Sequence, residues 1–536
     1  MRVSTGQYFA NSAASYSNAF ADTTKTQAQV SSGVRIQTAA DDPVGAAKLL
    51  KLQQQQTLLT QYSGNMTSVT NSLTQEESVL DSVNTALQRA QELTIRAGNG
   101  GISDADRTSI AAEIDEIKEN VYGLLNTKDS NGNYMFSGSK TSTPPYVRNS
   151  DGSFTYQGDQ TQLSLQVSDT LSLATNDTGY AIFDQATNTS RTQTTQTLPV
   201  VNDNVVSVSA GRLDSLTTYD KAFADGQPYT LEFTSSTTYT VKDKTLKDIT
   251  SQLAGNGTFD PKATGGTTVS IRGVEFAVNV TLPDTATTST LADAAVKDHV
   301  YTLSTKADTV SSSRNPSNTS GAQITSGTVT NPTAYSGGFP SAGVVVKFTD
   351  ADTYNVYAQP YSDSSKAIAT SSVDTVTDTS VTPNVTTRSF DFAGVTFALS
   401  DAPTANDQFV VQANTNKTQN VLNTLAQLST ALKLPVTDQA SQLALKNATD
   451  AALGNLAASS EKIDLTRGQI GARGNSLDIQ NEENVSLGLS NKSTQSSIAD
   501  TDLSTASIQL TLQQSMLEAS QLAFAKISQL SLFSKL

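Results

Sequence analysis

The chain has 536 residues, with no cysteine, no tryptophan and a single histidine, His299. The missing cysteine excludes disulfide bonds, cysteine zinc sites, iron–sulfur clusters and cysteine nucleophiles, and one histidine is too few for a multi-histidine metal centre. The 35 lysines and arginines face 50 aspartates and glutamates, and the resulting net charge of −15 disfavours nucleic acids and anionic membranes as partners.

The N-terminal stretch Met1–Phe9 lacks the apolar run, about 7–15 residues long, that marks a secretory signal peptide. No part of the chain approaches the roughly 18 consecutive apolar residues that suggest a membrane-spanning helix. We therefore expect no membrane insertion. If the protein leaves the cell, we expect a route that reads no cleaved signal.

A bend and a helix cap are expected where the first segment, 1–40, gives way to the next helix. Gly33 supplies backbone freedom for a bend. Asp42 suits an N-cap and Pro43 the first helical position, while acidic residues complement the helix dipole. Arg35 or Arg467 is available to pair with the acidic residues, and a plain solvated cap is the alternative. The candidate cap and bend residues are Gly33, Arg35, Asp41, Asp42, Pro43 and Arg467.

Apolar residues recur every seven positions in the helical region that follows, which extends to about residue 140. A second track lies three residues after the first, as in an a/d heptad pattern. Glu76 interrupts this second track, and we expect it to be partly exposed. Gly98, Gly100 and Gly101 end the helix, and a second helix packed antiparallel to the first is expected after them. The first track is Leu59, Met66, Leu73, Leu80 and Leu87.

Residues 141–415 change to alternating apolar and polar positions in short runs, which predicts an antiparallel β region. An internal repeat lies within it: Leu231, Phe233, Tyr239 and Val241 correspond to residues 115 positions later. We expect two related β units at about 205–290 and 325–413. The stretch 307–340 is expected to be a linker and His299 a surface residue.

Residues 416–536 return to a helical pattern. One track has heptad spacing, and the terminal stripe near the C-terminus has spacing of three and four residues. The heptad track is Leu456, Ile463, Ile470 and Leu477. The terminal stripe is Ile508, Leu512, Met516, Leu522, Ile527, Leu530 and Leu532.

The order of these regions predicts an α+β fold. A long-helix coiled-coil bundle is built from both chain termini, with a central antiparallel β insert of two or more small β units. The expected domains are terminal assembly segments 1–40 and 498–536, a helical bundle domain 41–140 and 416–497, and an outer β domain 141–415. The two heptad tracks are either a seam between subunits or the core of a monomeric bundle. For the terminal stripe, whose helices alone form too small a core, an interface between subunits is favoured.

No catalytic, metal-binding or cofactor-binding residues are expected. The segment Asp129–Asn133 superficially suggests a calcium loop, but its glycine falls at position four instead of six and position twelve is Lys140. A turn is the simpler interpretation. Packing is therefore the expected mechanism, and the protein is not expected to be an enzyme.

Several motifs resemble the bacterial flagellin superfamily. At the N-terminal side they are Gln29-Val-Ser-Ser-Gly-Val-Arg-Ile36 and Ala40-Asp-Asp-Pro-Val-Gly-Ala-Ala47. At the C-terminal side they are Arg467-Gly-Gln-Ile-Gly-Ala-Arg473 and Ser497-Ile-Ala-Asp-Thr-Asp502. The segment Asn131-Gly-Asn-Tyr-Met-Phe-Ser-Gly138 is similar to that of the flagellar hook-associated protein 3 family, the hook–filament junction proteins.

The resemblance implies a structural subunit of the bacterial flagellum that joins hook to filament. It implies an extracellular location after type III export without a cleaved signal peptide. The implied partners are further copies in a ring, an adjacent hook-associated junction protein, flagellin or the filament cap, and an export chaperone. A flagellin-type filament subunit is the nearest alternative, and a surface adhesin or a carbohydrate-active protein is the alternative from another class.

Overall fold

The computed structural model describes residues 5–149, 152–263, 266–315, 317–340, 342–362, 364–379, 385–414 and 416–533. The chain divides into two compact units. Unit 1 comprises 1–73, 164–175 and 471–536, and unit 2 comprises 74–163 and 176–470. The division into three domains expected from the sequence stays a prediction.

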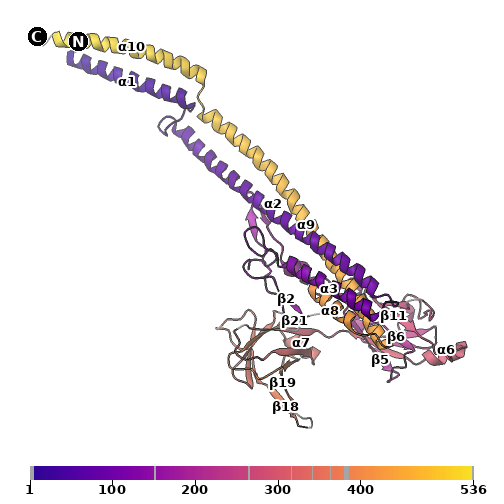
Figure 1. Cartoon of the computed structure of the whole chain (residues 1–536). Helices are drawn as coiled ribbons and strands as arrows, with labels where there is room; N and C mark the ends of the chain where they lie inside the picture. Colours follow the sequence, from indigo (N-terminus) through magenta and orange to yellow (C-terminus); the bar gives the residue numbers. More distant parts are fainter. Residues whose placement is uncertain are drawn as a thin grey trace. The chain divides into compact units, whose positions relative to one another are not determined.

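Unit 1 consists of two antiparallel helix pairs and a small hairpin (Figure 1). Helix α1 packs against α10, and the first part of α2 packs against the last part of α9. In the second pair, the amides of Asn484 and Asn491 donate to the carbonyls of Leu59 and Leu52, each over 2.9 Å. The bounds are α1 Thr5–Ser32, α2 Pro43–Ala97, α9 Gln439–Ala499, α10 Leu503–Phe533, β3 Ser164–Gln166 and β4 Ser172–Ala174.

Unit 2 contains the rest of α2 and α9, together with α3 (Asp104–Leu125) and α8 (Val421–Lys433). Ser103 caps α3 by accepting from the Asp106 amide, in the way expected of an N-cap serine. Helix α3 packs against α8, and the Lys433 ammonium group lies 2.6 Å from the Asp115 carboxylate on α3. Short helices in this unit are α4 Leu216–Thr218, η2 Tyr219–Phe223, α5 Ala224–Gly226, η1 Tyr180–Asp184, η3 Thr250–Gln252, α6 Ser289–Val296 and α7 Pro332–Gly338.

The heptad tracks are buried within the single chain. Those in unit 1 are Leu59, Met66, Leu73 and Leu477, and those in unit 2 are Leu80, Leu87, Leu456, Ile463 and Ile470. The expectation for Glu76 was wrong, because this side chain is only 2% exposed and accepts a hydrogen bond from the Asp177 amide. Burial by the chain's own helices is what the core of a bundle requires.

The strands of unit 2 are antiparallel and form several sheets. Strands β1 and β2 pair with each other. In a second sheet, β11 pairs with β10 and also with β6 and β7. A further sheet has the order β5-β12-β8-β9. Their bounds are β1 Tyr146–Arg148, β2 Phe154–Tyr156, β5 Thr192–Leu198, β6 Val206–Val208, β7 Arg212–Leu213, β8 Tyr229–Phe233, β9 Tyr239–Lys242, β10 Thr267–Ile271, β11 Val274–Val280 and β12 Val300–Thr305.

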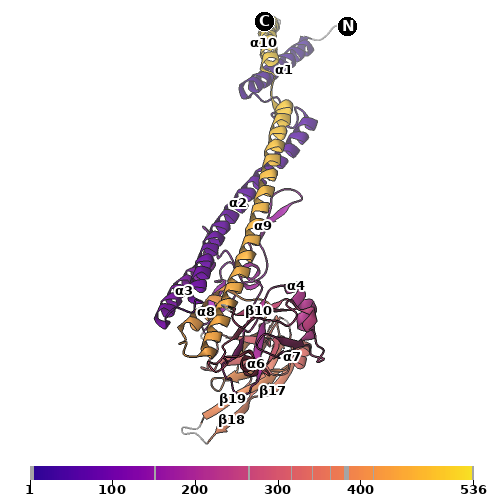
Figure 2. The ribbon, with the colours of Figure 1, turned by 90° about the vertical axis from the view of Figure 1, so that its right-hand side faces the viewer.

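The remaining described strands form one larger sheet in the order β17-β16-β15-β21-β13-β14-β20-β19-β18. Only Val373 separates its two edge strands β17 and β18 in sequence, so the sheet curls until its edges approach one another. Strands β18 and β19 extend from the sheet as a hairpin (Figure 2). The bounds are β13 Thr309–Arg314, β14 Ile324–Val329, β15 Val344–Phe348, β16 Thr353–Ala358, β17 Ala369–Ser372, β18 Asp374–Asp378, β19 Val385–Phe392, β20 Val395–Leu399 and β21 Gln408–Asn414.

The internal repeat of the sequence is also a repeat of strand register. Phe233 pairs with Tyr239 in the β8–β9 hairpin, and Phe348 pairs with Tyr354 in the β15–β16 hairpin. The β10–β11 and β19–β20 hairpins turn through Arg272-Gly273 and Ala393-Gly394, all four residues having positive φ, as a tight type I′ turn requires. Each β unit has its own aromatic-rich core.

The predicted α+β fold class is confirmed, with helices from both chain termini and antiparallel strands between them. Besides Glu76, two further local expectations were wrong. The stretch 307–340 is not a linker, because it supplies β13, β14 and α7. His299 is not a surface residue, because it is 3% exposed.

Candidate assembly surface

The contact between α1 and α10 is narrow and made largely of small or hydroxyl side chains. The less exposed positions recur at heptad spacing, as in a coiled coil. Near the chain termini, the centre of the Phe524 ring lies 5.2 Å from that of Phe9 and 6.1 Å from that of Tyr16. These positions are Ser12, Tyr16, Ala19, Thr23, Thr26 and Val30 on α1, and Ala506, Leu510, Gln513, Leu517, Ser520 and Phe524 on α10.

Helix α10 carries a second apolar stripe that this contact leaves uncovered. Ile508 is 73% exposed, Leu512 and Met516 are each 59% exposed, and Leu522 is 67% exposed. At 3.6 residues per turn, Ile508 and Leu522 project from the side of α10 opposite the α1 contact, whereas Leu512 and Met516 lie on the flank of α10, Met516 beside α1 side chains. The predicted interface residues Ile527, Leu530 and Leu532 lie outside the side chains that the structure describes.

Exposed large apolar side chains are concentrated in unit 1, although it is the smaller unit. Besides the α10 stripe they are Tyr8, Phe9, Phe20, Val44, Leu50, Leu58, Ile479, Val485, Leu487, Leu489 and Leu503. Extended apolar surface of this kind is typical of protein–protein contacts.

A groove of about 510 Å³ runs between α1 and α10 beside Met516. The α1 side of the groove is lined by short side chains, among them Ala14, Ser15 and Asn18. A wall of short side chains leaves room for larger side chains of another helix.

A short antiparallel connection joins the ends of the two helix pairs within unit 1. Gly33 ends α1 with φ +71°. The Arg35 amide donates to the Ala499 carbonyl over 2.6 Å, and the Thr501 amide donates to the Gly33 carbonyl over 2.9 Å. The Arg35 guanidinium also donates to the Ile498 carbonyl over 2.8 Å. The chain segments before α2 and after α9 are thus tied together at this point.

The two acidic residues beside this connection, Asp41 and Asp42, make different contacts. Asp42 precedes Pro43 and accepts from the Gly45 amide over 2.8 Å, which caps α2 and holds the pKa of Asp42 below its usual value. Asp41 accepts from the Lys25 ammonium group over 2.7 Å, and this hydrogen bond lowers the pKa of Asp41.

The two arginines expected near this pair have different partners. Arg35 lies 3.5 Å from Asp42. Arg467 belongs to unit 2 and pairs there with Glu77 at 2.8 Å and Asp81 at 3.1 Å. The sequence interpretation missed Lys25 as the partner of Asp41. No local pattern shows that the segment after α1 brings Asp41 back to the side of this helix.

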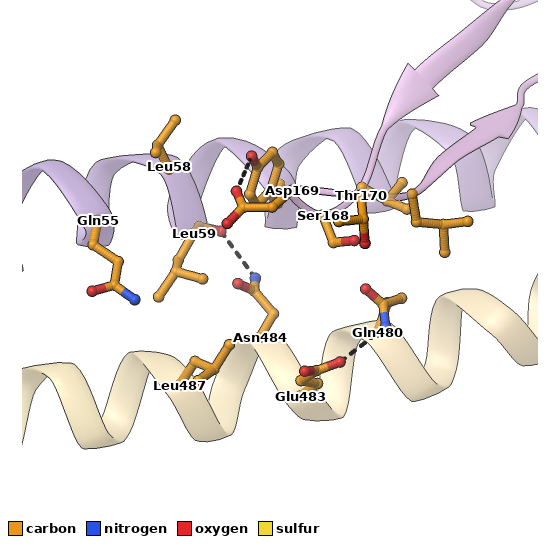
Figure 3. Close-up of a pocket in the computed structure, with 13 residues that line it drawn as sticks. Gln55, Leu58, Leu59, Ser168, Asp169, Thr170, Gln480, Glu483, Asn484 and Leu487 are labelled. Atoms are coloured by element: carbon orange, nitrogen blue, oxygen red, sulfur yellow. Dashed lines mark hydrogen bonds between the residues drawn. The ribbon is translucent and has the colours of Figure 1, made fainter.

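A pocket of about 450 Å³ lies in unit 1 between α2, α9 and the tip of the β3–β4 hairpin (Figure 3). Leu58 and Leu59 line one wall, Ser168 and Asp169 another, and Asn484 the third. The Tyr62 hydroxyl donates to Asp169 over 2.8 Å and fixes the hairpin tip. The hairpin was not assigned to the helices from the sequence, because strand periodicity does not reveal what a strand packs against.

Among the residues that the structure describes, no three acidic or histidine side chains gather as metal ligands would. The described helices include none that combines the length and apolar character needed to cross a membrane. Asp129 accepts from the amides of Asn131 and Asn133, so the segment considered as a calcium loop forms a turn around its first carboxylate.

Residues 3–141 match the model of the bacterial flagellin N-terminal helical region. Flagellar hook-associated protein 3 of Salmonella typhimurium is 35% identical over 187 residues, which are 35% of this chain and 58% of that protein. The Escherichia coli protein of the same name is 37% identical over 187 residues, which are 35% of this chain and 58% of that protein. A solved structure of hook-associated protein 3 from Legionella pneumophila, 19% identical, covers 83% of this chain and 96% of that chain with a TM-score of 0.48.

The chain thus spans less than two thirds of the curated relatives it matches. The predicted resemblance to the flagellin superfamily and to flagellar hook-associated protein 3 is confirmed.

Proposed function

We propose that this chain is a structural subunit of the bacterial flagellum that joins hook to filament through packing of its terminal helices. The observation that carries the assembly role is the uncovered apolar stripe of α10, beside a groove lined by short side chains. The position at the junction rests on the similarity to hook-associated protein 3.

The α10 stripe is the surface that meets other copies of the chain. Its side chains are too exposed to stabilise the isolated subunit, and burying one of them in a neighbouring subunit contributes about 1.5–3 kcal/mol. The α1–α10 groove receives side chains of a neighbour in the proposed ring. The partners on either side are an adjacent hook-associated protein and flagellin or the filament cap, and an export chaperone holds the chain before export without a cleaved signal.

Paired substitutions on α10 test the assembly role. I508S and M516S remove apolar area that the subunit itself does not bury, so the isolated chain should keep its helical content while assembly onto hooks is lost. The matched control is Q514S on the same helix, at another exposed position, which should assemble normally. Normal filament growth with the double variant I508S/M516S would contradict the proposal.

Labelling of detached flagella with an antibody against the β units separates the junction from the filament. A single band where the hook ends supports a junction subunit. Label along the whole shaft indicates the flagellin-type alternative. Loss of surface attachment, with swimming retained, after removal of the β units would indicate an adhesin instead.

A further inference from the structure

The turn that joins α2 to α3 contains an asparagine followed by two glycines. The Ile102 amide donates to the Asn99 carbonyl over 3.2 Å, which closes a four-residue turn with Gly100 and Gly101 at its centre. The side-chain oxygen Oδ1 of Asn99 accepts from the Gly101 amide, also over 3.2 Å. Asn99 and both glycines are exposed, so this turn is open to water.

These two hydrogen bonds leave the Gly100 nitrogen unused and next to the Asn99 side chain. Within the described part of the chain, the Gly100 amide has no hydrogen-bond acceptor. A Cβ atom added at Gly100 would meet no heavy atom within 4 Å. The hydrogen bond from Gly101 closes a ring of atoms that contains both the Asn99 Cγ and the Gly100 nitrogen, and it draws electrons away from Cγ. A nucleophile and an electrophilic carbon are thus held in one small turn.

We propose that Asn99 is a site of spontaneous covalent modification, in which the Gly100 nitrogen gives up its proton and attacks the Asn99 Cγ atom. A bond forms between these two atoms, the bond from Cγ to the side-chain nitrogen breaks, and that nitrogen takes up a proton and leaves as ammonia. The product is a succinimide ring. Water then opens the ring at one of its two carbonyl carbons and gives aspartate or isoaspartate, with no oxidation or reduction. Glycine favours the attack because no Cβ hinders its nitrogen.

A second asparagine–glycine pair, Asn131 and Gly132, lies in a turn that protects it. The Gly132 amide donates to the Asp129 carbonyl over 3.0 Å, so the nitrogen that would attack is already engaged. The amides on either side, of Asn131 and Asn133, both donate to the Asp129 carboxylate. Attack at Asn131 therefore requires that a hydrogen bond of the folded turn breaks first.

The third pair, Asn256 and Gly257, is held by packing. Gly257 is buried, and its carbonyl accepts from the Tyr239 amide over 2.8 Å. A Cβ atom added at Gly257 would lie 2.4 Å from the Thr250 side chain and 2.5 Å from the Tyr239 carbonyl oxygen. This peptide group has little room to turn towards the Asn256 side chain, so Asn99 is the asparagine whose surroundings favour ring closure.

The modification changes the connection between two helices of unit 2. Aspartate at position 99 places a negative charge just after the C-terminal end of α2, where the helix dipole disfavours it. Isoaspartate carries the main chain through the former side chain and so lengthens the four-residue turn. Both products act on the link to α3, the helix that packs against α8.

Mass spectrometry of the full chain, aged in warm neutral buffer, tests this selectivity. Trypsin separates the three pairs because it cleaves after Arg96, Lys128 and Lys247. Asn99 should be converted first, and Asn131 about fivefold to tenfold more slowly, the factor by which breaking one hydrogen bond typically slows a step. In urea, where the turns are lost, the three pairs should react at similar rates. Equal rates in the folded chain, or faster conversion of Asn131, would overturn the proposal.

The matched control is G100A. Gly100 lies outside the left-handed region and has open space around it, so alanine keeps the turn while its Cβ hinders the attacking nitrogen. Conversion of Asn99 should be suppressed in G100A, and conversion of Asn131 should be unchanged. Conversion of Asn99 at the original rate in G100A, or a product that contains aspartate without isoaspartate, would exclude the succinimide and overturn the proposal.

Discussion

Gly33 and Gly64 lie in the same unit, yet their backbones place opposite demands on a side chain. Gly33 has φ +71°, a conformation that an L-residue adopts at a cost of about 1 kcal/mol, whereas Gly64 is helical with no heavy atom within 4 Å of an added Cβ. We expect G33A to destabilise unit 1 by about 1 kcal/mol and G64A to stabilise it by about the same amount. Thermal unfolding followed by circular dichroism measures both changes in stability. Stabilisation by G33A as well as by G64A would contradict this account of the bend.

Asp184, in unit 2, is fully enclosed, and this burial raises its pKa to about 6 although Tyr146 and Asn420 donate to it. Between about pH 4 and pH 6 the folded chain therefore holds a proton that the unfolded chain has released. Stability falls as the pH rises through this window, and from about pH 5 to pH 7.5 the loss is about 1.4 kcal/mol. Urea unfolding of the wild type and D184N, followed by tyrosine fluorescence, measures the difference, and D184N should lack this loss. The same slope in both proteins would show that another group titrates.

Roles that depend on neighbouring residues were predicted correctly from the sequence, and roles that depend on distant contacts were missed. Asp42 before Pro43 caps a helix because both preferences act within one turn. Lys25 and the burial of Glu76 and His299 depend on contacts between distant parts of the chain, which no local pattern encodes.

At the scale of elements, the α1–α10 contact contains a polar side chain that weakens it. Within the described part of the chain, the Gln513 side-chain oxygen is buried without a hydrogen-bond partner, at a position of the stripe that faces α1. Replacing it in Q513L removes that cost, about 1–3 kcal/mol, and adds apolar contact. We expect slower amide exchange along α10 in the isolated subunit, with Q514L, at an exposed position, as the control. No slowing in Q513L would mean that Gln513 faces water in solution.

Element types followed from periodicity wherever a helix or strand had one face to bury. The heptad tracks predicted the long helices, and the repeated hairpins matched down to register. The stretch 307–340 escaped because its serines, threonines and asparagines read as a linker, yet β13 gains its hydrogen bonds from β21 about a hundred residues away. The packing of the β3–β4 hairpin in unit 1 is equally non-local.

At the scale of the whole molecule, the acidic excess lies outside the helices proposed to assemble. Helix α1 carries only Asp22 and Lys25 as charged residues, and α10 only Glu518 and Lys526, so each is neutral while the chain has a net charge of −15. An association built on such helices depends on apolar burial, with little contribution from ion pairs that salt would screen.

Assembly of the purified chain should therefore change little between about 50 and 500 mM sodium chloride. Sulfate, which strengthens apolar burial, should promote assembly, and cooling should weaken it because the hydrophobic contribution falls at low temperature. Sedimentation velocity measures each response, and I508S/M516S serves as the control that lacks the apolar stripe. Dissolution of assemblies by sodium chloride alone would instead indicate that charged groups elsewhere in the chain hold the copies together, and the α10 stripe would then not be the main contact.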